Sequence, residues 1–368
     1  MINNNKINNK YNSGNDKYLG IDIGGTNIRF GIVDKKGKLL SFNLFPIDKS
    51  ADAAILHIKK FINQMSAKSK IEFKNVKNYN ADNNGDNNLG LDNNLGLDNN
   101  LGLDNNIDIK AIGISAAGQI EKEKGIITYS PNLNWKNVHI KEELENSFNI
   151  PVFIDNDVKT IAYAEWKLGA GRGIKNLICI FIGTGIGSGL IINNKLIDGC
   201  SGSAGEIGHI TIVSGGRKCH CGNNGCFEAY AGGWGIAEMT KEKAIHNPEK
   251  YKKIIELSKG GINNISSKSL GEAFILKDET AKELVYEIAL YIADGVISAV
   301  NLLNPCMVVL GGGVVDGIPD LVEIAEKEIR KRALNTAVKS LKIVKSKFGE
   351  SAGLIGAAMI AKSMIRSS

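Results

Sequence analysis

The sequence is poor in the features that mark secreted and membrane proteins. Its first residues are rich in asparagine and lack the apolar core of a secretory signal. No run of about eighteen uncharged apolar residues occurs, and the most apolar segment, residues 284–303, carries Glu287 and Asp294. Six cysteines among 368 residues are too few for a disulfide scaffold. We therefore expect a cytoplasmic protein that does not associate with a membrane.

The charge is nearly balanced and spread over the whole chain. Lys and Arg number 45 and Asp and Glu number 39, for a formal net charge of +6, and no basic block stands out. We therefore expect no nucleic acid partner. The length suggests about two domains, with enough chain to bury a large core without disulfides or metals.

Two segments are too rich in asparagine to belong to the fold. Residues 1–17 have almost no periodic apolar residues, and we interpret them as a disordered tail. Residues 75–106 contain the hexapeptide Leu-Gly-Leu-Asp-Asn-Asn three times without change, from Leu89, Leu95 and Leu101. Hexapeptide repeats can build a β-solenoid, but three rungs cannot bury a core by themselves. We favour a low-complexity insertion over a small solenoid.

The rest of the chain alternates between apolar strands and helices with one apolar face. The expected strands are residues 18–24, 28–34, 109–114, 152–154, 177–182, 189–192 and 307–310, and the expected helices include residues 51–65, 158–168, 281–303 and 353–365. Hairpins and strands that alternate with helices predict an α/β protein with mixed sheets flanked by helices.

A glycine turn between the first two expected strands is a candidate phosphate site. Its residues are Asp22, Ile23, Gly24, Gly25, Thr26 and Asn27. Glycines permit positive φ and let a phosphate approach backbone N–H groups closely. Thr26 and Asn27 add side-chain donors, and Asp22 at a strand end is suited to hold Mg²⁺ through water. A plain hairpin turn is the alternative that these residues leave open.

Two further glycine turns follow buried strands. The first runs from Gly183, Thr184 and Gly185 to Gly189, and the second consists of Gly311, Gly312 and Gly313. The first of these does not match the dinucleotide fingerprint, and the chain contains no P-loop. Two Gly-Thr turns between strands suggest two hairpins that grip one nucleotide, and the third turn would let an adenine ring approach the backbone. A plain strand-to-helix turn also explains the third, and none of the three turns is decisive by itself.

A short cysteine-rich segment predicts a metal site. Cys219, Cys221 and Cys226 lie within eight residues, and His209 precedes them. Three thiolates and one imidazole form the closed tetrahedral set of a structural zinc site, which leaves no position for a reactive water. His220 is a competing ligand that spacing alone does not exclude. Buried free cysteines are the less favoured alternative.

A carboxylate at the end of the expected strand 152–154 is a candidate general base. Phosphorylation of an alcohol requires a group that accepts the hydroxyl proton, and ligands of α/β sheets gather at the carboxyl ends of strands. Asp155 and Asp157 both fit, and either one can instead cap the helix that follows. The residues alone do not choose between them.

Together these motifs resemble the ROK family of sugar kinases and repressors, within the actin-like ATPase superfamily. The resemblance runs from Tyr18 to the C-terminus, apart from the insertion. It implies a two-lobed actin-like (ribonuclease H-like) fold. The expected small lobe spans residues 18–157 with the helix 353–365, and the expected large lobe spans residues 158–352 with a zinc-binding loop at residues 206–228.

The resemblance also implies roles for individual residues. The turns at residues 22–27 and 183–189 match the family's phosphate turns, and residues 311–313 match its adenosine turn. Asp157 matches the base, and His209, in Glu206-Ile207-Gly208-His209, matches the fourth zinc ligand. The residues that match the sugar contacts are Gly118, Asn132, Asn156, Asp157, Glu206, His209 and Glu228.

The activity that the resemblance implies is ATP-dependent phosphorylation of a hexose, most simply glucose at its 6-hydroxyl, with Mg²⁺ and a structural Zn²⁺. N-acetylmannosamine, N-acetylglucosamine and fructose stay open, because residues 227–234 depart from the commonest glucokinases. A sugar-responsive repressor or a sugar-binding regulator without catalysis is the second alternative. Repressors of the family carry an N-terminal winged helix-turn-helix, for which the seventeen residues before the first strand leave no room. Relatives are often homodimers, and we expect the same here.

Overall fold

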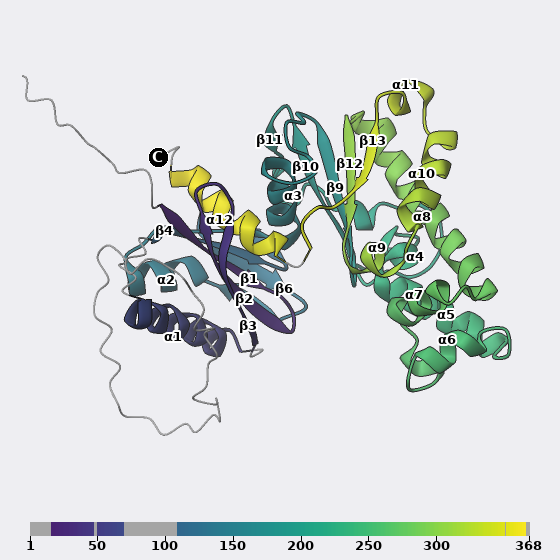
Figure 1. Ribbon diagram of the computed structural model, residues 1–368, viewed down its shortest axis with the longest axis horizontal. Helices are drawn as coiled ribbons and strands as arrows, with labels where there is room; N and C mark the ends of the chain where they lie inside the picture. Colours follow the sequence, from purple (N-terminus) through teal and green to yellow (C-terminus); the bar gives the residue numbers. More distant parts are fainter. Residues whose placement is uncertain (1–15, 48–49, 70–108, 350, 366–368) are drawn as a thin grey trace, which may run out of the picture. The chain divides into compact units, whose positions relative to one another are not determined.

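The computed structural model describes residues 16–47, 50–69, 109–349 and 351–365. The chain divides into two compact units (Figure 1). The first unit comprises Met1–Asp157 and Gly353–Ser368, and the second comprises Val158–Ala352. The expected insertion lies outside the described residues, as does the expected tail up to residue 15. The tail was expected to include Lys17, which is wrong, because Lys17 begins the first strand and pairs with Asp34.

A five-stranded mixed sheet forms the centre of the first unit. Its strands are, in sheet order, β3 (Leu39–Pro46), β2 (Asn27–Asp34), β1 (Lys17–Ile23), β4 (Ile109–Ala116) and β8 (Val152–Asn156). The pairs β1–β2 and β2–β3 are antiparallel, whereas β1, β4 and β8 are parallel. The carboxyl ends of these three parallel strands therefore lie at one edge of the sheet.

Helices α1 (Ala51–Ser69) and α2 (Ile140–Phe148) share one hydrophobic core with alternate residues of β1 and β2, so they cover one face of the sheet. Helix α12 (Ala352–Ile365) packs against the other face (Figure 1). There Gly20 of β1 pairs with Gly113 of β4, and a Cβ at these positions would lie 2.3 Å from Leu354 O and 1.9 Å from Ala357 O, respectively. Only glycine lets the helix backbone come this close to the strands.

A small antiparallel sheet follows β4 in the first unit. Its strands are β5 (Gln119–Glu121), β6 (Ile126–Ser130) and β7 (Trp135–Val138). Ile127 and Trp135 are buried and join the core that α1 and α2 cover. These strands are too short to show a clear alternation, which is why the expected strands do not include them.

The second unit contains another five-stranded mixed sheet. Its strands are, in sheet order, β11 (Lys195–Leu196), β10 (Ile186–Ile192), β9 (Leu177–Ile182), β12 (Met307–Gly311) and β13 (Lys342–Lys345). Ile178, Ile180 and Ile182 of β9 point into a large helical core, and Leu177 and Cys179 point toward the opposite layer. Both faces of β9 are therefore buried, as expected for its continuous apolar sequence.

Helices flank both faces of this second sheet, so the chain has the mixed α/β architecture that the alternation of strands and helices predicts. Helix α3 (Asp157–Lys167) leads into the unit and packs on one face. The others are η1 (Ile207–His209), α4 (Glu228–Ala231), α5 (Gly233–His246), α6 (Lys252–Leu257), η2 (Ile262–Asn264), α7 (Ser267–Ile275), α8 (Glu279–Leu303), α9 (Gly313–Gly317), α10 (Leu321–Arg332) and α11 (Asn335–Val338). Within the described ranges, no helix has both the length and the apolar character that a membrane span requires.

The second glycine turn is shorter than expected, because β10 begins at Ile186. Gly187 and Gly189 therefore belong to a strand. A Cβ at Gly187 would lie 2.7 Å from Val158 Cγ2, and one at Gly189 would lie 2.2 Å from Ala162 Cβ. These two glycines let α3 pack closely on β10, which leaves Gly183–Gly185 as the turn itself.

Glu165 of α3 is fully buried and anchors the segment that follows β13. Its Oε1 accepts hydrogen bonds from Ser346 Oγ at 2.6 Å and from the backbone N–H groups of Lys347 and Phe348 at 2.7 and 2.8 Å. Its Oε2 accepts one from Ala170 N at 2.9 Å. Four donors thus compensate for the burial of one carboxylate, as a buried charge requires.

Candidate functional site

Polar side chains gather at the carboxyl ends of the three parallel strands of the first unit. The register pairs Asp22 of β1 with Ser115 of β4, and Ser115 with Asp155 of β8. Asn156 follows, and its Nδ2 donates a hydrogen bond to Gly118 O at 3.1 Å. Asp157 comes next, as the first residue of α3. Ligands of α/β sheets bind at this edge, so these residues occupy a suitable place for substrate contacts.

Asp22 lies largely buried between two donors. Its Oδ1 accepts a hydrogen bond from Ser115 Oγ at 2.8 Å, and its Oδ2 lies 3.1 Å from Arg29 Nη1. Burial raises the pKa of Asp22 above its ordinary value, although Ser115 and Arg29 act in the opposite direction. A nearby cation would relieve this cost of burying the charged carboxylate.

The first glycine turn is a tight hairpin between β1 and β2. Gly24 N donates to Asn27 O at 2.9 Å, and the exposed Thr26 accepts from Asn27 Nδ2 at 3.2 Å. The expected positive φ is wrong here, because neither Gly24 nor Gly25 lies in that region. A Cβ at Gly25 would instead lie 3.4 Å from Asn132 Cβ, which brings this turn next to a predicted sugar contact.

Asp155 and Asp157 have different environments. The side chain of Asp155 is 2% exposed, its Oδ2 lies 2.5 Å from Lys122 Nζ, and its Oδ1 accepts the backbone N–H of Asn156 at 2.8 Å. Asp157 is only partly buried and stands at the N-terminus of α3. The carboxylate of Asp155 thus supports the turn, whereas that of Asp157 is more accessible to a substrate.

The second glycine turn of the chain, Gly183–Gly185, is held by the start of α5. The backbone N–H groups of Gly233 and Trp234 donate to Gly183 O at 2.9 Å and to Thr184 O at 3.1 Å. Gly183, like Gly24 and Gly25, does not have a positive φ. Apart from its chain neighbours, no atom of the described residues would lie within 4 Å of a Cβ at Gly183, so packing among them does not require glycine at this position.

The third glycine turn connects β12 to α9. Gly311 ends the strand, Gly312 has a φ of +96°, and Gly313 begins the helix. Among the glycines of the three turns, Gly312 alone has a positive φ. A Cβ at Gly312 would also lie 2.6 Å from Ile182 O, so β9 and β12 approach each other closely at this point.

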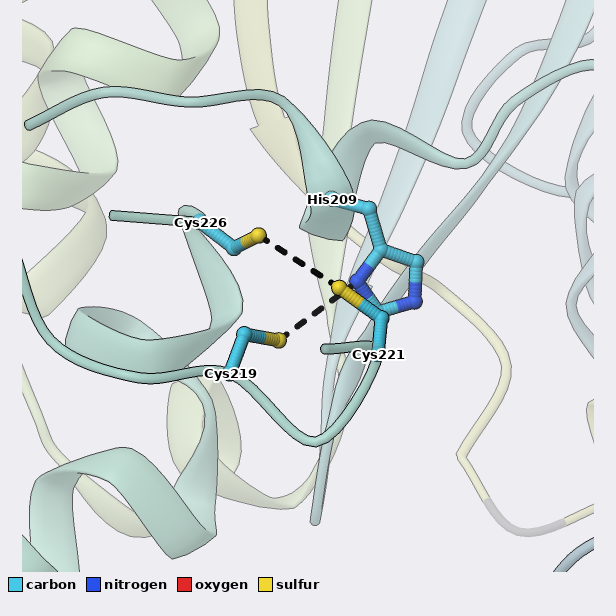
Figure 2. Close-up of side chains that lie close together, drawn as sticks. All are labelled: His209, Cys219, Cys221 and Cys226. Atoms are coloured by element: carbon cyan, nitrogen blue, oxygen red, sulfur yellow. Dashed lines mark hydrogen bonds between the residues drawn. The ribbon is translucent and has the colours of Figure 1, made fainter. Parts of the chain in front are cut away.

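The structure brings together the four residues of the predicted metal site. Nδ1 of His209 and the Sγ atoms of Cys219, Cys221 and Cys226 all lie within 4.8 Å of one another (Figure 2). His209 ends η1, and the three thiols come from residues 219–226, which we call the cysteine loop. His220, the competing ligand, stacks its ring on Trp234 with centroids 4.0 Å apart.

The spacing of these atoms fits a tetrahedral zinc ion. Zn–S bonds of about 2.3 Å place two sulfur ligands about 3.8 Å apart, and the Sγ atoms of Cys221 and Cys226 lie 3.7 Å apart. Cys219 Sγ lies 3.8 Å from His209 Nδ1. Without a metal, burial raises the pKa of Cys226 to about 12, so a bound metal would displace a proton from this thiol.

The two predicted sugar-binding glutamates lie on either side of the cysteine loop in the chain. Glu206 is exposed and immediately precedes η1. Glu228 begins α4, and its Oε2 accepts the backbone N–H of Ile186 at 2.7 Å. Glu228 is thus fixed directly after the Gly183–Gly185 turn.

Three residues that support this region are absent from the predicted site. Lys159 is 4% exposed, and its Nζ donates to Gly202 O at 2.6 Å. Ser188 Oγ donates to Gly205 O at 2.6 Å, so the two side chains hold the loop before Glu206. Trp234 donates from Nε1 to Glu228 Oε1 at 3.0 Å. Of these three, only Lys159 had a signal in the sequence, because it is a charged residue within the apolar pattern of α3.

Comparisons with known proteins agree with these features. The model of the ROK family matches residues 102–364. A glucokinase from Streptomyces coelicolor is 30% identical over 345 residues, which covers 94% of this chain and 97% of the relative. A xylose repressor from Bacillus subtilis is 33% identical over 251 residues, which covers 68% of this chain and 60% of the repressor.

A solved structure gives the same result for the fold. The crystal structure of a ROK family glucokinase from Streptomyces griseus, in complex with glucose and AMPPNP, has a TM-score of 0.74 and 29% sequence identity. It covers 94% of this chain and 99% of the glucokinase. The expected actin-like ATPase fold is therefore confirmed. The chain belongs to the ROK family.

Proposed function

We propose that this protein transfers the γ-phosphoryl group of ATP to the 6-hydroxyl of glucose. At the coarser level the chain is an ATP-dependent sugar kinase, since glucokinases match it over nearly their whole length. The assignment of glucose as the substrate is supported by the match to glucokinases. It is also supported by Glu206 and Glu228, which flank the residues of the Cys₃His cluster in the chain. Carboxylates that flank a loop held by a metal are suited to accept sugar hydroxyls.

Asp157 is the proposed general base. Its position at the carboxyl edge of the sheet and its partial exposure suit a group that accepts the proton of a sugar hydroxyl. Asp155 is unsuited to this role because Lys122 and the N–H of Asn156 already occupy its carboxylate. Asn156, Gly118 and Asn132 complete the proposed sugar contacts of the first unit.

The glycine turns are the proposed contacts for ATP. Gly24, Gly25, Thr26 and Asn27 in the first unit and Gly183, Thr184 and Gly185 in the second offer N–H and hydroxyl donors to phosphates. Gly311, Gly312 and Gly313 are the proposed adenosine contacts. Asp22 offers carboxylate oxygens of the kind that Mg²⁺ prefers, directly or through water, and the ion would neutralise charge on the phosphates.

Zinc has a structural role in this proposal. His209, Cys219, Cys221 and Cys226 would hold the ion and fix the cysteine loop beside Glu228. His209 presents Nδ1 to the cysteines, so its Nε2 would contact a sugar hydroxyl. Four protein ligands leave no position for a reactive water, which distinguishes this site from a hydrolytic one.

A coupled ADP-release assay tests the proposal. Glucose, N-acetylmannosamine, N-acetylglucosamine and fructose are each supplied with ATP and Mg²⁺, and glucose should give the highest kcat/KM. A higher value for one of the other sugars would reassign the substrate within the same reaction. The match to a xylose repressor supports a regulator as the second candidate, and that candidate predicts sugar binding with no ADP release.

A further inference from the structure

We infer that Trp234 is a positioning residue that orients the carboxylate of Glu228 against the cysteine loop. The inference rests on the proposed function, since it takes Glu228 as a sugar ligand. Trp234 lies in α5 and does not belong to the cysteine loop or to any of the three glycine turns. It contacts two of these elements and Glu228 at the same time.

The carboxylate of Glu228 is held from two directions. Oε2 accepts the backbone N–H of Ile186 at 2.7 Å, and Oε1 accepts the indole N–H of Trp234 at 3.0 Å. These two donors fix the plane of the carboxylate. Each oxygen keeps a further lone pair, so both can still accept a hydroxyl from a ligand.

The indole itself is held by the cysteine loop and by a glycine turn. Its ring stacks on His220 with centroids 4.0 Å apart and planes 23° apart. His220 stands between Cys219 and Cys221, so a metal that binds these thiols also fixes the position of His220. The backbone N–H of Trp234 donates to Thr184 O at 3.1 Å. The direction of the indole N–H therefore depends on both the loop and the turn.

Trp234→Phe tests this role because phenylalanine keeps an aromatic ring beside His220 but has no N–H donor. We expect the KM for the hexose to rise about tenfold, the value of one hydrogen bond to a charged group. The expected changes in kcat and in the KM for ATP are less than about threefold. A merely structural role would lower the melting temperature or the active fraction and leave the hexose KM unchanged.

Trp166→Phe is the matched control. Its indole N–H donates to Ile174 O at 3.0 Å in the same unit, so this variant also loses one indole hydrogen bond. The hexose KM should stay at the native value in Trp166→Phe. Equal hexose KM values in the two variants would overturn the inference.

A second readout needs no turnover. Removal of zinc by a chelator should release His220 from Trp234 and change the tryptophan fluorescence of the native protein. The change should persist in Trp166→Phe and disappear in Trp234→Phe. The inference would be overturned if zinc removal changed the fluorescence of Trp234→Phe as much as it changes that of the native protein.

His220→Ala removes the imidazole ring that stacks on Trp234 and leaves the indole in place. This variant tests the inference if Trp234→Phe does not fold. We expect its hexose KM to rise about threefold, the value of one aromatic stacking contact, and a native KM in this variant would count against the inference. Failure of the proposed function looks different: the native protein itself would then form no ADP with any of the four sugars.

Discussion

Asp155 Oδ2 lies 2.5 Å from Lys122 Nζ, two residues before the carboxylate that we propose as the base. The ion pair is nearly buried on the aspartate side, where the side chain is 2% exposed, and partly exposed on the lysine side, at 30%. The two neighbouring aspartates should therefore respond differently to the same substitution.

Asp157→Asn should abolish most of the activity and preserve the fold. Loss of a general base lowers kcat by about 100- to 10,000-fold, whereas the partly exposed position tolerates an amide. Asp155→Asn is the matched variant, and it should cost about 2–3 kcal/mol of unfolding free energy, because Lys122 loses its charged partner. Sugar-dependent ADP release and urea unfolding measure the two effects. Near-native kcat in Asp157→Asn would contradict the assignment of the base.

Asp22→Asn should make the stability of the protein less sensitive to pH. The pKa of Asp22 is raised in the folded state, so its contribution to stability is complete below the unfolded pKa and is lost as the pH rises through the folded pKa. An amide does not titrate. The unfolding free energy of the variant minus that of the native protein should therefore increase as the pH rises above about 4, the unfolded pKa of an aspartate. Urea unfolding at several pH values measures this slope, and a flat difference would show that the pKa is not raised.

Cys219→Ser should release the metal and loosen the sugar site. Zinc content measured by mass spectrometry should fall by at least about tenfold, because three ligands do not replace a closed set of four. The KM for the hexose should rise more than that for ATP. Cys306→Ser is the control, since Cys306 is exposed and lies outside the metal cluster. Full zinc content in Cys219→Ser would rule out this ligand set.

Gly183→Ala should weaken ATP binding without destabilising the protein. Among the residues that the structure describes, a Cβ at this position meets no atom beyond its chain neighbours, so the unfolding free energy should stay the same or rise by less than about 1 kcal/mol. A phosphate close to the backbone would meet the added methyl group, and the KM for ATP should rise about tenfold. Gly349→Ala, where a Cβ also meets nothing, should change neither quantity. A native KM for ATP in Gly183→Ala would place the phosphates elsewhere.

Glu165→Gln should destabilise the second unit. The carboxylate accepts four hydrogen bonds, and an amide replaces one acceptor oxygen by a donor that faces other donors. We expect a loss of about 3 kcal/mol, measured by urea unfolding. Glu326→Gln disrupts only an ion pair with Arg330 on one helix, and it should change stability by less than about 0.5 kcal/mol. Similar losses in both variants would mean that the buried acceptor has no special role.

The sequence predicted the fold class and the family because the signals for both are local. The strands at residues 18–24 and 177–182 are continuous apolar runs, and each ends in a glycine turn. The cysteine spacing lies within eight residues, so the cluster needed only one partner from elsewhere, His209. By contrast, β3 and the β5–β7 sheet have short or mixed patterns that resemble loops.

The rest of the site depends on packing between distant segments. Nothing in the spacing of Trp234 and Glu228 shows that the indole N–H points at the carboxylate, or that His220 stacks on the ring. Likewise, the glycines at positions 187 and 189 look like part of a phosphate turn, but they are required by contact with α3. One-dimensional patterns reveal which residues have the right chemistry, and tertiary contacts decide which of them meet.

The contact of α12 with Gly20 and Gly113 has a consequence for biosynthesis. Residues 353–365 leave the ribosome last among the described residues, yet they cover a face of the sheet that the earliest strands begin. All of residues 158–352 has emerged by then, so the second unit can reach its native state first. The nascent first unit should stay incomplete, with that apolar surface open to chaperones, until residues 353–365 have emerged.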